Sequence, residues 1–99
     1  MIIYEVNIKY DSNIFLQLKP WLLLHAKKMI TFKGFTDYKI YIDENLTNIL
    51  SIHYHIKNIE CFNEYINNHS KEMREEGIKK FGKSIKARRR VLSKVDYNE

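Results

Sequence analysis

The sequence predicts an α+β fold in which strands and helices follow the order β-α-β-β-α-β. Two patterns lead to this prediction. Four segments alternate apolar and polar residues, as half-buried strands do, and two segments repeat apolar residues every three or four positions, as amphipathic helices do. With 44% apolar and 29% charged residues, the 99-residue chain has the composition of a globular protein. A chain of this length normally forms one domain, so residues 1–99 are expected to be a single domain.

The first half of the chain is expected to form a strand, a helix and a second strand. Residues 2–10 alternate and predict the first strand. Residues 14–30 carry a helical apolar stripe, for which the side chains of residues 11–13 are candidate N-caps. Pro20 is expected to kink this helix or to restart it, because proline lacks a backbone donor. Residues 35–43 alternate again and predict the second strand.

The second half repeats the pattern in the order strand, helix, strand. Residues 46–56 alternate and follow the second strand after a short turn, which indicates a hairpin. Asn58 is a candidate N-cap for a helix whose apolar stripe covers residues 59–73, and Gly77 is expected to interrupt that helix. The last strand is expected over residues 84–95.

This order is typical of the ferredoxin-like fold, a four-stranded antiparallel sheet with both helices on one face. The opposite sheet face would then be uncovered, and a second copy, a small ligand or single-stranded nucleic acid can cover such a face. Stacking of RNA bases on it is disfavoured because Glu5, Asn7, Ser51 and His53 stand where stacking aromatics are needed. The residues expected on the uncovered face are Ile3, Glu5, Asn7, Phe35, Lys39, Tyr41, Ile49, Ser51, His53 and His55.

The net charge of +5 belongs to the end of the chain. Residues 1–70 hold seven basic and seven acidic residues, whereas residues 71–99 hold ten and five. Such a patch attracts phosphates, although a genome of low GC content would also enrich lysine. Alternation in a strand separates Arg89 from its two arginine neighbours. The candidate nucleic-acid contacts are Lys79, Lys80, Lys83, Lys86, Arg88 and Arg90.

Five polar residues are candidates for binding a small ligand. Two histidines lie on helix stripes, one lies in the third strand, and Arg89 shares a strand face with apolar residues. A buried guanidinium needs an anionic partner, which would be a carboxylate such as Glu5 or the carboxylate or phosphate of a ligand. The alternative is purely structural, with hydrogen-bonded boundary histidines and an internal ion pair. The candidates are Asn7, His25, His53, His69 and Arg89.

No metal and no cofactor are expected. A pair of imidazoles without a nearby carboxylate or thiolate is a poor ligand set for zinc. The single cysteine, Cys61, excludes a disulfide framework and a cysteine-rich zinc site. Phosphate-binding glycine loops and the common hydrolase motifs are absent. The first residues do not resemble a signal peptide and the longest apolar run, Trp21–Leu24, is far too short for a membrane span. These features favour a cytoplasmic protein without a membrane partner.

Several short motifs in a fixed order give the chain a family resemblance. They are MIIYEVNI, Trp21 with His25, Gly34-Phe35-Thr36, Ser51-Ile52-His53-Tyr54, His69, Arg74, Phe81-Gly82 and Arg89-Arg90-Val91-Leu92. Together they resemble an uncharacterised small bacterial family, a domain of unknown function within the dimeric α+β barrel superfamily. The resemblance implies a cytoplasmic homodimer formed through the uncovered sheet face, and no particular activity. The chain departs from the family at Ala26-Lys27, where an Ile-Pro step is usual, at Gly77, where a histidine is common, and in its shorter hairpin.

Three functions follow from this sequence. The first is a homodimer that binds a small ligand or has a structural role. The second is a basic protein that binds nucleic acid or the ribosome through residues 79–94. A weaker resemblance to a small-subunit ribosomal protein supports this alternative. The third is a cofactor-free oxygenase of the dimeric barrel type, in which the resemblance implies Asn, Trp and His around an aromatic substrate. Asn7 fits this set, but Trp21 lies on a helix. Whether the protein is an enzyme is left open.

Overall fold

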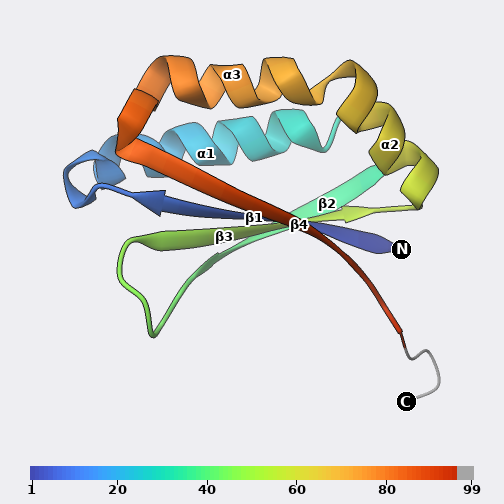
Figure 1. Ribbon diagram of the computed structural model, residues 1–99, viewed down its shortest axis with the longest axis horizontal. Coiled ribbons are helices and arrows are strands. Elements are labelled where there is room, and N and C mark those ends of the chain that lie inside the picture. The colour runs from blue at the N-terminus through green and yellow to red at the C-terminus, as the bar shows by residue number, and fades with distance from the viewer. Residues whose placement is uncertain (96–99) are drawn as a thin grey trace.

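The computed structural model describes residues 1–95 and shows a sheet covered on one face by helices (Figure 1). The four antiparallel strands lie in the order β2-β3-β1-β4. This is the predicted ferredoxin-like arrangement, and residues 96–99 of the predicted domain lie outside the described residues. The strands are β1 (Ile2–Tyr10), β2 (Phe35–Ile42), β3 (Ile49–Ile56) and β4 (Ile85–Ser93). The helices are α1 (Phe15–Met29), α2 (Ile59–Asn68) and α3 (Ser70–Phe81), with 3-10 turns η1 (Ser12–Ile14) and η2 (Gly82–Ser84).

The core lies between the helices and the alternate residues of β1 and β3. Val6 pairs with Ile52 on one side and with Arg89 on the other, so these three side chains point to the same face of the sheet. Burial of apolar side chains here supplies the main driving force for folding. Leu18, Ile52 and Ile56 are fully enclosed.

The helical region after β3 is two helices, where the sequence predicts one helix interrupted at Gly77. The break lies at His69, whose backbone leaves the helical conformation (φ −132°, ψ −23°). The His69 ring stacks on Phe32 with the ring centroids 4.4 Å apart, which ties the break to the connection between α1 and β2. The Ser70 hydroxyl donates a hydrogen bond to the carbonyl of Ile66 across the break. Gly77 is buried inside α3, so its prediction as a helix breaker is wrong.

The side chain of Phe35 lies in the core, not on the uncovered face as predicted. Phe35 pairs with Ile56 and Asp37 pairs with His55, so an extra residue, Thr36, is inserted into β2. This β-bulge reverses the alternation and turns Phe35 toward the helices. Its ring lies 5.2 Å from that of Tyr65 in α2, centroid to centroid.

Several element boundaries also differ from the predictions. Strand β3 begins at Ile49, because residues 46–48 form the hairpin turn, where Asn48 adopts a positive φ of 63°. None of the side chains of residues 11–13 caps a helix, since this segment enters the turn η1. Helix α1 continues without a restart through Pro20. The predicted cap at Asn58 is confirmed, because its side chain accepts a hydrogen bond from the backbone N–H of Cys61 at 2.9 Å.

Candidate functional site

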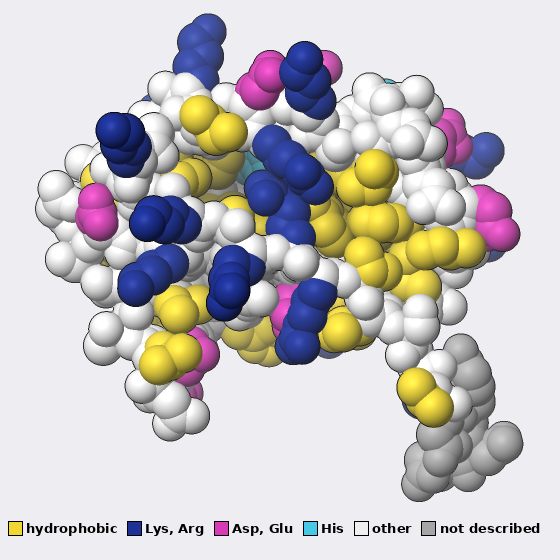
Figure 2. All heavy atoms as spheres, viewed as in Figure 1, with side chains coloured by type: hydrophobic (Ala, Val, Ile, Leu, Met, Phe, Trp, Pro, Cys, Tyr) yellow, Lys and Arg dark blue, Asp and Glu magenta, His cyan; other side chains and the backbone are white. Residues whose placement is uncertain are grey.

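A cavity of about 260 Å³ lies between the helix layer and the sheet, toward β4. Its floor comes from β1, β3 and β4 and its roof from α1, α2 and α3. Figure 2 shows Lys and Arg side chains at a hollow between β4 and the helices, with hydrophobic side chains around it and a histidine visible behind them. Residues from six elements therefore enclose one space, and most of its wall is apolar.

Aromatic side chains form much of this wall. Tyr4 is central, with its ring centroid 6.1 Å from that of Tyr54 and 6.0 Å from that of Tyr65. Trp21 enters from α1 and packs edge-on against Phe81 at 5.4 Å. Burial raises the pKa values of Tyr54 and Tyr65, so both hydroxyls are neutral at physiological pH.

Gly77 leaves room for the cavity on the side of α3. A Cβ atom at this position would lie 3.3 Å from the indole of Trp21 and 3.6 Å from Cδ1 of Ile85. A larger side chain would therefore project into the space between the helix layer and β4. The absence of a side chain here keeps the tryptophan accessible to the cavity.

His25 stands on the cavity wall next to Trp21, on which its ring stacks at 4.6 Å. Its Nδ1 atom lies 3.4 Å from Oε1 of Glu76 in α3, and the other oxygen of Glu76 forms an ion pair with Lys28. Burial lowers the pKa of His25, and the positive charges of Lys28 and Arg89 act in the same direction, whereas Glu76 opposes them. Burial and the neighbouring cations thus favour the neutral imidazole.

Two arginines complete the polar part of the cavity. Arg74 reaches it from α3 and Arg89 from β4. Within residues 1–95, no carboxylate lies within ion-pair distance of either guanidinium. The suggested pairing of Arg89 with Glu5 is wrong, because Glu5 points to the other face of the sheet and pairs there with Arg90.

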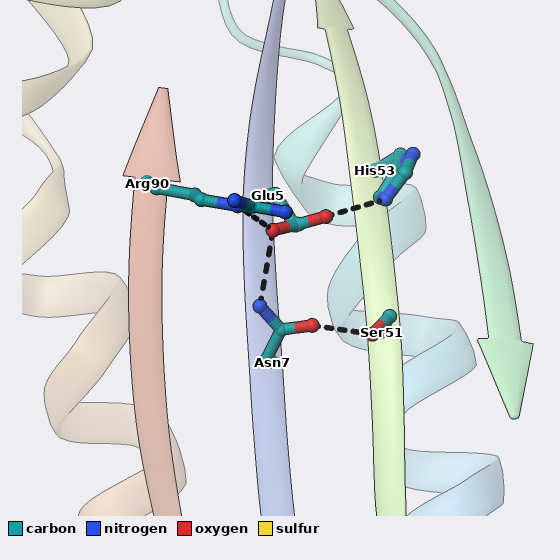
Figure 3. Close-up of polar contacts among 5 residues, drawn as sticks. All are labelled: Glu5, Asn7, Ser51, His53 and Arg90. Carbon is teal, nitrogen blue, oxygen red and sulfur yellow. Dashed lines mark hydrogen bonds and ion pairs between the residues drawn. The ribbon is translucent and has the colours of Figure 1, made fainter. Parts of the chain in front are cut away.

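That other face carries a separate polar network across β4, β1 and β3 (Figure 3). The carboxylate of Glu5 forms an ion pair with Arg90, lies 3.0 Å from Nε2 of His53 and accepts a hydrogen bond from the Asn7 amide at 3.1 Å. Asn7 in turn accepts a hydrogen bond from Ser51. Glu5 is only 6% exposed, and Arg90 lowers its pKa although burial opposes the shift. The charge in the middle of the uncovered face is therefore already neutralised within the chain.

The five candidate ligand-binding residues do not form one site. His25 and Arg89 line the cavity, whereas Asn7 and His53 lie on the uncovered sheet face. His69 is at the break between α2 and α3, against Phe32, and does not line the cavity.

Residues that the predicted set lacks include Arg74 and the tyrosines of the wall. Arg74 and Ile78 are four residues apart, so both lie on the same side of α3. The sequence signal that singles out Arg74 is its place among the motifs of the family resemblance. The tyrosines at positions 4 and 54 look like ordinary core residues in the sequence.

The basic patch is distributed over several surfaces. Lys79 and Lys80 lie in the last turn of α3, and Lys83 lies in η2. The face of β4 that points away from the helices carries Lys86, Arg88 and Arg90. Lys and Arg side chains gather over β4 in Figure 2. Because Arg90 is paired with Glu5, only part of this charge is available to a partner on that face. Nothing in the fold or the comparisons below supports nucleic acid as the partner.

Two further features concern metals and membranes. Within residues 1–95 no three His, Cys, Asp or Glu side chains come together as a metal site. None of the helices in this part of the chain is long and apolar enough to cross a membrane.

Comparison with known proteins places the chain in a family. Residues 1–95 match the family described as a domain of unknown function, DUF4286, and the chain belongs to it. This confirms the predicted family of unknown function. Comparison with curated protein sequences gives no significant match.

Solved structures of the same fold include enzymes. One, from Deinococcus radiodurans, has a provisional description as an antibiotic biosynthesis monooxygenase (TM-score 0.78, 12% identity, covering 100% of this chain and 97% of that one). Another is SnoaB, a cofactor-independent oxygenase from Streptomyces nogalater (TM-score 0.73, 7% identity, 98% and 96% covered). A third is the heme-degrader MhuD from Mycobacterium tuberculosis with two hemes bound (TM-score 0.73, 11% identity, 100% of both chains). At these identities the likeness shows the fold alone.

Proposed function

We propose that the protein binds a small, largely apolar molecule in the cavity between its sheet and its helices. The observation that supports this most directly is the cavity itself, about 260 Å³ in volume, with an aromatic wall and a few converging polar groups. This combination is typical of binding sites for small molecules. The volume is just below the usual range for drug-sized ligands, which favours a ligand of one or two rings.

Binding can be followed at Trp21, the only tryptophan of the chain. The aromatic acid 2-naphthoate is titrated into 15N-labelled protein, and the single indole N–H resonance is expected to shift with saturation. Gly77→Leu should weaken this binding at least tenfold, because the new side chain projects toward Trp21. Asn67→Leu, an exposed position in α2, is the matched control and should bind as the native chain does.

Ala87→Leu, which places a larger side chain on the cavity floor, serves as a second blocking variant if Gly77→Leu does not fold. Circular dichroism establishes folding before each titration. Undiminished binding by a folded blocking variant would place the ligand elsewhere and refute the proposed site.

We also propose that a second copy of the chain covers the uncovered sheet face. No helix of residues 1–95 covers this face, and it carries both apolar and polar side chains, with Tyr41 47% exposed. The internal pairing of Glu5 with Arg90 means that burial of this face would not isolate the charge of Glu5.

Sedimentation analysis tests the dimer. Ser51→Arg places a charged side chain in the middle of the face and is expected to convert the dimer to a monomer, whereas Thr31→Arg, after α1, should not. A native chain that sediments as a monomer at all concentrations would refute the dimer.

A second candidate function is a cofactor-independent oxygenase, favoured by the neutral imidazole of His25 in an aromatic cavity. His25 would remove a proton from an acidic methylene group beside an aromatic ring. The carbanion would then supply electrons to O₂, so that the methylene carbon loses two hydrogens and gains one oxygen, and the second oxygen leaves as water. Asn7 and His53 lie outside the cavity and take no part in this scheme.

The test is oxygen uptake with 2-indanone, with His25→Gln as the variant and His55→Gln, on the uncovered face, as its control. Oxygen uptake that is equal in His25→Gln and the native chain, or absent from the native chain, would refute this function.

A further inference from the structure

The cavity has a positively charged end formed by two elements that face each other. Arg74 comes from α3 in the roof and Arg89 from β4 in the floor. Both are on the cavity side of their elements, because Arg89 pairs with Val6 of the core and Arg74 lies one turn from Ile78. Arg74 and Arg89 are thus the two arginines that line the cavity.

The described chain does not supply that anion. Glu76, the acidic group that contacts the cavity wall, is already engaged by Lys28 and His25. Glu5 is engaged by Arg90 on the other face of the sheet. Among residues 1–95, none of the ion pairs involves Arg74 or Arg89.

The positive field reaches the interior of the cavity. The positive charge of Arg89 acts to lower the pKa values of three separate wall residues, His25, Tyr54 and Tyr65. Arg74 acts in the same way on Tyr65. These groups belong to α1, β3 and α2, so the field is felt on several sides of the cavity rather than at one contact.

We infer that the cavity selects aromatic carboxylates, with the carboxylate held by Arg74 and Arg89 and the ring placed against Trp21 and Tyr65. The planar guanidinium fork matches both oxygens of a carboxylate, and charge-assisted hydrogen bonds of this kind are stronger than neutral ones. This inference rests on the proposed small-ligand function and adds the charge class of the ligand.

The test compares two probes of nearly identical shape, 2-naphthoate and the uncharged 2-naphthamide. Calorimetry and the Trp21 indole resonance report the affinity of each. The acid is expected to bind roughly tenfold more tightly than the amide, since the arginines are open to solvent and their pairing is worth less than in a closed site. Arg89→Gln should reduce this preference to less than about threefold.

Arg88→Gln is the matched control. Arg88 is the adjacent residue of β4, carries the same charge, is similarly exposed and points to the opposite face of the sheet beside Asn7. It should leave the preference for the acid unchanged. On α3, Arg74→Gln should reduce the preference, whereas Lys71→Gln, in the first turn of the helix, should not.

Failure of this inference is distinguishable from failure of the proposed function. Equal binding of both probes, with loss of binding in Gly77→Leu, would retain the cavity as a site and overturn selection for a carboxylate. Equal effects of Arg88→Gln and Arg89→Gln would attribute the preference to the overall charge of β4 and would also overturn it. Absence of binding by both probes would overturn the small-ligand function itself.

Discussion

Substitution of Gly34 by alanine is expected to be among the most destabilising single-methyl changes in this protein. Gly34 precedes β2 with a positive φ of 83°, a conformation that costs an L-residue about 1–2 kcal/mol. A Cβ atom would also overlap both Cβ and Sγ of Cys61, which is buried in the first turn of α2. Overpacking of this kind costs about 1–3 kcal/mol. The two terms together predict a loss of about 2–5 kcal/mol in the free energy of unfolding.

Gly82 provides an internal control for this prediction. It also has a positive φ, 54°, but no heavy atom lies within 4 Å of the position of its Cβ. Gly82→Ala should therefore cost only the backbone term, about 1–3 kcal/mol for this sparsely populated conformation (ψ −126°). Urea unfolding monitored by circular dichroism measures both variants. Equal losses for Gly34→Ala and Gly82→Ala would refute the claim that contact with Cys61 restricts position 34.

Three further predictions concern pH and helix capping. Burial lowers the pKa of His25, so the folded state protonates this imidazole less readily than the unfolded state does. Stability should therefore fall as the pH drops through about 6.5, and it should fall less steeply in His25→Gln. Because the pKa of Glu5 is lowered, Glu5→Gln should reduce the free energy of unfolding by about 1 kcal/mol at pH 7 and by progressively less as the pH falls below 4.5. A loss that does not change with pH would contradict the network of Figure 3. Asn58→Ala should cost about 1 kcal/mol through loss of the cap of α2. Asn13→Ala, whose side chain caps no helix, should stay within about 0.5 kcal/mol. Urea titrations across pH test all three.

The order of elements was predictable because each carries its own period. Strand β1 covers Ile2–Tyr10 as predicted, since five apolar residues alternate there without interruption. The errors arise where a local pattern is overridden by a contact distant in sequence. Thr36 looks like an ordinary strand residue, and only its pairing with β3 makes it a bulge. Likewise, Gly77 is a poor helix former, yet it is kept inside α3 by packing against Trp21.

The sequence does not predict that the candidate ligand-binding residues lie on two opposite faces of the sheet. Alternation within β4 correctly distinguishes Arg89 from Arg88 and Arg90, but it does not say which of the two faces points to the helices. That depends on the register in which β4 pairs with β1, about eighty residues earlier in the chain, where Arg89 lies opposite Val6. A shift of the pairing by one residue would have placed Arg89 beside Glu5.

The three consecutive arginines therefore do not act as one basic motif. Arg90 neutralises a carboxylate that is almost inaccessible to solvent, so its charge supports the sheet more than it attracts a partner. Arg88 is the member that remains on the same face without an ion pair among the described residues. Arg89 is turned to the cavity, where its charge acts on His25 and two tyrosines. A polyanion that approaches the uncovered face would meet one free arginine of the three, whereas a small carboxylate in the cavity would meet Arg89 together with Arg74. The three arginines thus divide between the two faces of the sheet, a division that the net charge of the sequence alone does not reveal.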